Sequence, residues 1–141
     1  MAKVAINELG AFTDVVKLDF NDLIAIGNGG TRVIAKIPAN AAVELAGVAN
    51  TVDIAGSSSL VIDVGTTSAD PDEFIDALDV DAMTVPVFNT GDQFTSGYSK
   101  AVKAVASETE VYIKVTDSAV ASLTAGEIVV GLRILDLAKF A

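Results

Sequence analysis

Apolar and polar residues alternate along several segments of this chain, as they do in β-strands that bury one face and expose the other. The alternation is clearest in segment 109–116, where every second residue is a branched aliphatic: Val111, Ile113 and Val115. Segments 32–37 and 59–64 show the same period of two. The pattern therefore predicts half-buried strands at these three positions.

A longer apolar segment, residues 43–54, changes phase part-way along. Its apolar residues are Val43 and Leu45 in the first part, then Val48, Val52 and Ile54 in the second. A strand that buries one face throughout needs an extra residue at such a change, so the sequence predicts a β-bulge or bend near Gly47. Further strands are predicted at 14–19, 23–26, 84–88 and 99–106.

Segment 127–137 differs from the others because it is apolar on both faces. Such a strand is either central in a sheet or covered by a neighbouring subunit, and we favour cover by a neighbouring subunit. This prediction defines a set of residues for core and subunit packing: Ile128, Val129, Val130, Leu132, Ile134, Leu135 and Leu137.

One short helix is predicted at residues 71–78. Asp70 is suited to the N-cap, Pro71 to the first helical position, and Glu73 to the returning contact of a capping box. Phe74 and Leu78 lie four residues apart, so they would share the face that anchors this helix to the sheets.

Nine predicted strands separated by turns indicate an all-β chain, folded as a two-sheet antiparallel β-sandwich of jelly-roll-like type. Residues 13–141 are expected to form this single domain, and residues 1–12 an N-terminal arm. The glycine-rich segment 27–30 follows a strand, as a phosphate-binding loop does, but it precedes another predicted strand. We therefore interpret it as a tight turn rather than a phosphate site.

The composition is more apolar than one small domain needs. Hydrophobic residues make up 51% of the chain and its mean hydropathy is +0.52. The longest run without a charged residue, 82–91, is too short for a membrane span, so no membrane partner is expected. Lys3 is followed by only three apolar residues, so no secretory signal is expected either. Burial in a subunit interface remains as the explanation for the apolar surplus.

Three residue types that carry much enzyme chemistry do not occur: the chain has no cysteine, histidine or tryptophan. Redox and zinc chemistry at side chains is therefore not expected, and neither a cofactor nor catalysis is predicted. Paired carboxylates for glycoside hydrolysis would need an aromatic cleft, which an aromatic content of 6% does not favour. The acidic run 63–82 is open to two interpretations, a calcium site and a solvated acidic face, and we favour the latter, with no metal site.

The net charge of −10 comes from the middle of the chain. No lysine or arginine lies between Lys36 and Lys100, whereas this stretch carries ten acidic residues. The two flanks hold nine acidic and nine basic residues, which cancel. An acidic surface repels phosphates, so no nucleic acid partner is expected.

Three segments together resemble the tailed-bacteriophage decoration, or cement, proteins of the capsid. They are "IPANAAVELAGV" at 37–48, "LVIDVGTTSADPDEFIDALDVDA" at 60–82 and "TEVYIKVTDSAVASLTAGEIVVGLRIL" at 109–135. The resemblance spans residues 24–135. The turn Gly65-Thr66-Thr67 departs from it, because a Gly-Asp-Ser-like turn is expected there.

The resemblance implies a structural virion protein, made in the host cytoplasm, that acts on the outer capsid surface. It implies a jelly-roll-like homotrimer that bridges and stabilises subunits of the major capsid protein, with no catalytic residues. We assign the capsid contact to the N-terminal arm, through Lys3, Val4, Ile6, Leu9 and Phe12. We expect the acidic middle to face outward, away from the shell.

An alternative is a jelly-roll binding module: a head-fibre base, a tail adaptor or a part that binds a host glycan. Glycan binding would need aromatic residues at loop tips, for which Phe88, Phe94 and Tyr98 are the candidates. The role of Lys139 and Phe140, as a frayed tail or a docking hook, stays open.

Overall fold

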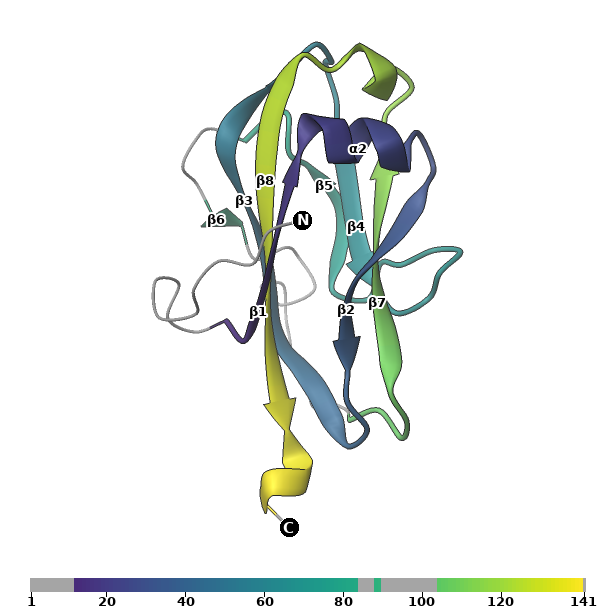
Figure 1. Cartoon of the computed structure of the whole chain (residues 1–141), viewed down its shortest axis with the longest axis vertical. Helices are drawn as coiled ribbons and strands as arrows, with labels where there is room; N and C mark the ends of the chain where they lie inside the picture. Colours follow the sequence, from purple (N-terminus) through teal and green to yellow (C-terminus); the bar gives the residue numbers. More distant parts are fainter. Residues whose placement is uncertain (1–11, 84–87, 90–103, 141) are drawn as a thin grey trace.

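The computed structural model describes residues 12–83, 88–89 and 104–140, whose strands form two antiparallel four-stranded sheets packed face to face (Figure 1). Sheet A consists, in order across the sheet, of β1 (Asp14–Asp19), β8 (Ala125–Asp136), β3 (Ala41–Ala55) and β6 (Phe88–Asn89). Sheet B consists of β2 (Thr31–Ile37), β7 (Thr109–Thr116), β4 (Val61–Gly65) and β5 (Ile75–Asp79). The predicted all-β sandwich is therefore confirmed.

The strands pair in a nested way. β1 pairs with β8, β2 with β7, β3 with β6 and β4 with β5, and every pair is antiparallel. The chain thus resembles one long hairpin, closed at β4 and β5, whose successive strand pairs are distributed between two sheets. This nesting makes the sandwich jelly-roll-like.

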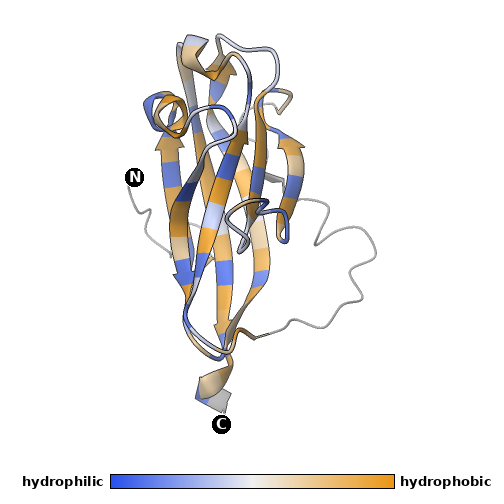
Figure 2. Ribbon diagram, turned by 90° about the vertical axis from the view of Figure 1, so that its right-hand side faces the viewer, coloured by the Kyte–Doolittle hydropathy of each residue, from blue (hydrophilic) through white to orange (hydrophobic). Residues whose placement is uncertain are grey.

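The core lies between the sheets and consists of the buried apolar residues of the strands. Figure 2 shows hydrophobic and hydrophilic residues following one another along the strands. Each sheet contributes fully buried aliphatic side chains to this core, among them Leu18, Val48, Ile62, Ile113 and Ile128. Burial of such a side chain contributes roughly 1.5–3 kcal/mol. The predicted inward faces of 59–64 and 109–116 are confirmed.

The helix is not where it was predicted. Helix α2 spans Phe20–Ile26, within a region for which a strand at 23–26 was predicted. Asp19 is its N-cap, and the carboxylate of Asp22 returns to the Asp19 backbone N–H, which completes a capping box. Leu23 is fully buried under the helix. Figure 1 shows α2 crossing one end of the sandwich, from β1 in sheet A to β2 in sheet B.

Residues 71–78 form no helix, so that prediction is wrong. Residues 75–79 are strand β5, paired with β4. Val64 pairs with Ile75 and Ile62 with Leu78, so β5 carries one residue more than β4 between these two pairs. The bulge brings the apolar residues Ile75 and Leu78 into register with β4, whereas the helix prediction rested on the four-residue spacing of Phe74 and Leu78.

Strand β3 carries the predicted irregularities, though not at Gly47 itself. The register with β8 shifts between Val43 and Leu45 and again between Asn50 and Ala55, whereas Gly47 pairs regularly with Gly131. Two short 3-10 helices flank β8, namely η1 (Val120–Ser122) and η2 (Leu137–Phe140). Strand β8 lies between β1 and β3 and is thus central in its sheet.

Some predictions fall on residues outside the described ranges. These are the arm up to residue 11, most of the strand at 84–88 and most of the strand at 99–106; residues 104–106 are not strand. Within the described ranges, no helix combines the length and apolar character needed to cross a membrane.

Candidate assembly interface

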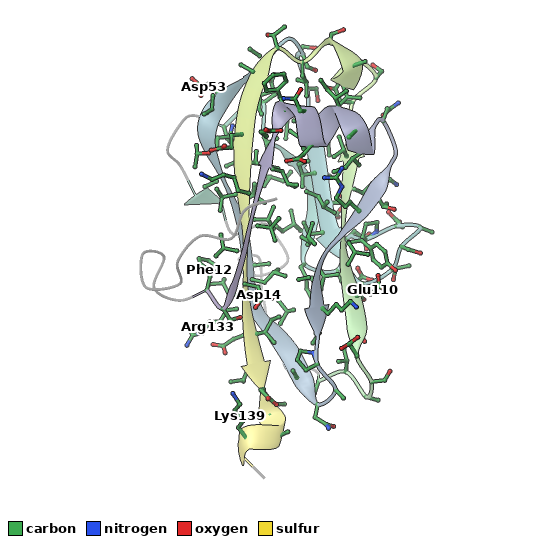
Figure 3. All side chains as sticks on the ribbon, viewed as in Figure 1. Phe12, Asp14, Asp53, Glu110, Arg133 and Lys139 are labelled. Carbon is green, nitrogen blue, oxygen red and sulfur yellow. The ribbon has the colours of Figure 1, made fainter. Side chains whose placement is uncertain are left out.

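The outer face of sheet B is polar. Val111, Ile113 and Val115 of β7 point into the core, so the residues between them point outward. These outward residues are Glu110, Tyr112 and Lys114, and the neighbouring strands add Lys36 of β2 and Asp63 of β4. Figure 3 shows Glu110 on this side of the molecule. Solvent is the natural environment for such a face.

The outer face of sheet A is apolar at its centre. Val15 of β1 and Val129 of β8 point away from the main core, yet they are only 3% and 7% exposed. They pack with Phe12 in a second cluster, with Leu45 of β3 against it. We call Phe12, Val15, Val129 and Leu45 the outer cluster; Figure 3 shows Phe12 at the outer side of sheet A.

Gly131 of β8 makes room for the outer cluster. Gly47 of β3 and Gly131 of β8 are paired in register, and Val15 pairs with Gly131 from the other side. A Cβ atom at Gly131 would lie 2.9 Å from Cγ and from Cδ1 of Phe12, closer than real Cβ atoms come to a neighbour. The Phe12 ring therefore occupies space that only glycine leaves open. We call the Gly47–Gly131 pair the glycine notch.

Thr13 fastens the chain next to the notch. Its backbone N–H donates to the Leu132 carbonyl at 2.9 Å, and its hydroxyl donates to the same oxygen at 3.2 Å. The Ile134 N–H donates to the Thr13 hydroxyl oxygen at 2.9 Å. These three bonds extend the pairing of β1 with β8 by one residue and hold the Phe12 backbone close to Gly131.

Charges on the outer face of sheet A are paired. Lys17 lies 3.5 Å from Glu127, and Arg133 lies 3.7 Å from Glu44. The Thr51 hydroxyl also donates to Glu127 at 2.6 Å. Half-exposed pairs of this kind contribute little to folding stability. Within each pair the two opposite charges cancel.

The predicted packing residues of β8 divide between the two faces. Ile128, Val130 and Leu132 are buried in the chain's own core, so their side chains have no surface left for a partner. Ile134 is partly buried against the same core. The other face carries Val129, in the outer cluster, and the half-buried Leu135; Leu137, also half-buried, begins η2. Subunit packing stays a prediction for these last three residues.

The predicted capsid-contact residues Lys3, Val4, Ile6 and Leu9 lie outside the described ranges. Phe12 is described, and its position differs from the expectation. It is only 9% exposed and packs against its own sheet, so it is not available as an exposed contact. Sequence reasoning missed this role because Phe12 packs over Gly131, and this contact between distant residues depends on the fold.

The acidic run lies on sheet B, and Asp63 holds the bulge of β5. The Ala77 N–H donates to the Asp63 carboxylate at 2.7 Å, and Ala77 has a φ of 52°, a left-handed conformation unusual for alanine. Burial raises the pKa of the Asp63 carboxyl; the Ala77 hydrogen bond and Lys114 lower it, and Asp76 and Asp70 raise it. The net result is a raised pKa.

Glu73 closes the loop between β4 and β5. Its carboxylate accepts from the Thr66 N–H at 2.9 Å and from the Thr66 and Thr67 hydroxyls. A Cβ atom at Gly65 would lie 1.7 Å from a Glu73 oxygen, so this closure needs glycine there. Burial opposes ionisation of Glu73, but the hydrogen bonds from Thr67 and Thr66 outweigh it and lower its pKa. Glu73, predicted to complete a helical capping box, thus accepts its hydrogen bonds within a loop instead.

The acidic residues serve structural roles in other places too. Asp79 accepts from the backbone N–H groups of Leu60 and Asp81, at 3.2 and 3.0 Å. Among residues 12–83, 88–89 and 104–140, no group of three acidic side chains could hold a metal ion. Carboxylates directed at nearby N–H groups are not arranged around a common point, as calcium ligands are.

Two buried polar residues were not singled out from the sequence. The Asn50 side chain, fully buried, donates to the Val80 carbonyl at 2.7 Å and so joins β3 of sheet A to the end of β5. The Asp117 N–H donates to the Asn28 side chain at 3.0 Å, and its carboxylate accepts from the Ala119 N–H at 2.8 Å. The sequence could have indicated the role of Asp117, because aspartate often accepts a hydrogen bond from the backbone two residues further on, in an Asx-type turn.

Comparison with known proteins identifies the fold. No protein-family model and no curated protein matches this chain. A chain of the solved structure "Cyanophage Pam1 capsid asymmetric unit" matches with a TM-score of 0.56 and 16% identity, over 84% of this chain and 79% of that one. A chain of "Capsid of Ralstonia phage GP4" matches with a TM-score of 0.52 and 19% identity, over 96% of this chain and 90% of that one. At these identities the likeness is one of fold.

Proposed function

We propose that this chain is a structural virion protein of a tailed bacteriophage, which decorates and stabilises the capsid. In this proposal it is a jelly-roll homotrimer on the outer capsid surface and bridges subunits of the major capsid protein. The observation that carries the proposal is the fold likeness to chains of two phage capsid structures, which extends over most of the length of each matched chain. The resemblance of residues 24–135 to capsid decoration proteins supports it independently.

The distribution of charge and apolar surface supports one orientation on the capsid. The acidic run lies on β4, β5 and the loops beside them, in sheet B, whereas the first and last strands, β1 and β8, are neighbours in sheet A. The two acidic strands β4 and β5 thus lie in the other sheet from β1 and β8. We propose that sheet A faces the subunits and the shell, and that sheet B faces solvent.

The proposed mechanism is surface burial rather than catalysis. A stable interface of standard size buries about 1,600 Å² in total, and apolar area contributes about 25 cal/mol per Å² of it. The ordering of side chains and the loss of free motion offset much of that gain. A face that is already rigid and charge-balanced, such as the outer face of sheet A, reduces these costs.

Two measurements test the proposal. Light scattering at micromolar concentration is expected to give the mass of a trimer; a monomer would contradict the trimer. Particles of the parent phage, assembled with and without this chain, are then compared by electron microscopy and by heat resistance. We expect added density on the outer surface and a higher rupture temperature with the chain. Particles of equal density and equal rupture temperature would contradict a decorating role.

A further inference from the structure

The turn that connects α2 to β2, residues 27–30, contains the only Asn-Gly sequence of the chain, Asn28-Gly29 (Figure 1). Both residues are exposed to solvent. Asparagine is a chemically labile residue, and a following glycine makes it more so, because no side chain hinders the attack of the glycine nitrogen on the asparagine side chain. Asn28 is therefore open to a covalent change that needs no enzyme.

Two hydrogen bonds hold this dipeptide in the folded chain. The Asp117 N–H donates to the Asn28 side-chain oxygen at 3.0 Å, and the Gly29 N–H donates to the Val115 carbonyl at 2.7 Å. The Val115 N–H also donates to the Gly30 carbonyl, at 3.1 Å. An amide proton in such a bond is removed by solvent only when the bond opens. The paired turn thus protects the nitrogen that would attack and fixes the side chain that would be attacked.

We propose that Asn28 is a site of spontaneous deamidation, gated by the opening of turn 27–30. In the open turn the Gly29 nitrogen loses its proton to hydroxide and attacks the side-chain carbonyl carbon of Asn28. A new C–N bond forms, and the bond to the side-chain nitrogen breaks. The nitrogen keeps the electron pair of that bond, takes up a proton and leaves as ammonia. Water then opens the five-membered imide at either carbonyl, which gives aspartate or isoaspartate. One water is consumed, one ammonia is released, and nothing is oxidised or reduced.

Either product places a new carboxylate where negative charge already accumulates. The altered side chain faces the backbone of Asp117, a residue that is only 6% exposed. Burial raises the pKa of Asp81, and the negative charges of Asp79 and Asp117 raise it further. A further negative charge at this end of the sandwich is unfavourable for the same reason.

Isoaspartate has a second effect, because it lengthens the backbone by one atom. The chain at position 28 is held at two points, by the Gly29 N–H on Val115 and by the Asp117 N–H on the side chain. A longer backbone between these points cannot keep both bonds at their present lengths. We therefore expect the deamidated chain to unfold at a midpoint about 4 °C lower than the unmodified chain. This inference does not rest on the proposed role in a capsid.

The site is tested by incubating the purified full chain at neutral pH, folded and in urea. Trypsin cleavage after Lys17 and Arg32 gives one peptide that contains both Asn21 and Asn28. Mass spectrometry follows the replacement of NH₂ by OH, and fragmentation assigns it to one asparagine. We expect conversion at Asn28, and conversion about tenfold slower or more in the folded chain than in urea. No conversion in urea would overturn the site, and equal rates would overturn the gate.

Gly30→Ala opens the turn without changing the reacting dipeptide. A Cβ atom at Gly30 would lie 1.9 Å from the Ile26 carbonyl oxygen, so the turn has to move. Deamidation of the folded variant is expected to be about tenfold faster than in the folded wild type, with equal rates in urea. Equal rates in the two folded chains would overturn the gate.

The matched control is Gly65→Ala, in the loop between β4 and β5. A Cβ atom there would lie 1.7 Å from a Glu73 side-chain oxygen and 2.8 Å from the Glu73 nitrogen, so this variant strains a different loop. It is expected to leave the rate at Asn28 unchanged. Acceleration as large as in Gly30→Ala would show that general loss of stability, and not opening of turn 27–30, controls the reaction, and would overturn the gate.

Should Gly30→Ala fail to fold, hydrogen exchange of the wild type measures the opening instead. Folding is expected to slow deamidation at Asn28 and exchange of the Gly29 amide by the same factor, because both need the open turn. Deamidation slowed about tenfold less than exchange would place the reaction in the closed turn and overturn the gate. Thermal unfolding of the deamidated fraction checks the consequence, and an unchanged midpoint would overturn it.

Discussion

The two outer faces of this sandwich belong to sheets of the same architecture, but their surfaces differ in chemical character. Behind each lies a four-stranded antiparallel sheet that buries aliphatic side chains in a common core. The outer face of sheet A is apolar at its centre, carries the glycine notch and has paired charges. The outer face of sheet B carries Glu110, Lys114 and the acidic residues beside β5. Folding alone does not require this difference, whereas the proposed assembly on a shell would make use of it.

The edge strands β1 of sheet A and β5 of sheet B also differ from each other. β1 pairs with β8 without any shift of register, whereas β5 is short, bulged and flanked by acidic residues. Bulges and charges on an edge strand discourage pairing with another chain. The β5 edge of sheet B is thus protected against pairing with another chain.

The largest difference in folding stability between the two faces is expected when a carboxylate is introduced into each of them. Val129→Asp places a carboxylate in the outer cluster, and should lower the free energy of unfolding by about 3 kcal/mol. Val33→Asp places one on the outer face of sheet B, opposite Tyr112, and should lower it by less than about 1 kcal/mol. Urea denaturation measures both. Equal losses would show that the two faces do not differ in burial.

A smaller loss of folding stability is expected when the Phe12 ring is removed. Phe12→Ala should lower the free energy of unfolding by about 2 kcal/mol, because a buried ring is lost and the notch is left empty. Tyr112→Ala, the aromatic control on sheet B, should cost about 1 kcal/mol or less because its side chain is half-exposed. A Phe12 loss no larger than that of Tyr112 would contradict the outer cluster.

Ala77→Gly should stabilise the chain, by about 0.5–1 kcal/mol, since glycine adopts the φ of 52° without steric cost. The control is Ala49→Gly, in the regular part of β3, which should destabilise by a similar amount. Thermal unfolding of both variants provides the measurement. Loss of stability in Ala77→Gly would show that the bulge is not strained.

The smallest effect expected is a change in the dependence of stability on pH. The pKa of Asp63 is raised in the folded state, mainly by burial, so its contribution to stability is full below the unfolded pKa and is lost as the pH rises through the folded pKa. An asparagine side chain at this position cannot ionise, but its carbonyl oxygen can still accept from the Ala77 N–H. Asp63→Asn should therefore be more favourable, relative to wild type, at about pH 7 than at about pH 3. A difference in the free energy of unfolding that is the same at both pH values would contradict a raised pKa.

The regular parts of the fold were predictable from the sequence, whereas the parts where strands depart from a period of two were missed. Strands such as 109–116 have one buried face and an unbroken alternation, so the strand and its buried face follow from the pattern. The register of Ile75 and Leu78 depends on a bulge, and their spacing then resembles that of a helix. The helix at 20–26 starts with a capping box that has aspartate at both positions, and its seven residues are too few for a clear helical period.

The candidate interface was predicted only in part for a similar reason. The apolar surplus and the two-faced apolar pattern of β8 are sequence properties, and both indicated that more than one face of sheet A is buried. The packing of Phe12 with Val129 could not be predicted, because it forms only when the chain before β1 lies over Gly131, more than a hundred residues away in the sequence. Contacts between distant residues are not contained in local periodicity.

The central claim, that sheet A faces the shell and sheet B faces solvent, is tested most directly by labelling single cysteines. The chain has no cysteine of its own, and Val52 and Glu110 are accessible on the outer faces of sheets A and B, respectively. Val52→Cys and Glu110→Cys are each labelled with a maleimide, first in the free chain and then in assembled particles of the parent phage. We expect both to react in the free chain, and only Glu110→Cys to keep reacting at the same rate in particles. Protection of Glu110→Cys with continued labelling of Val52→Cys would contradict the claim.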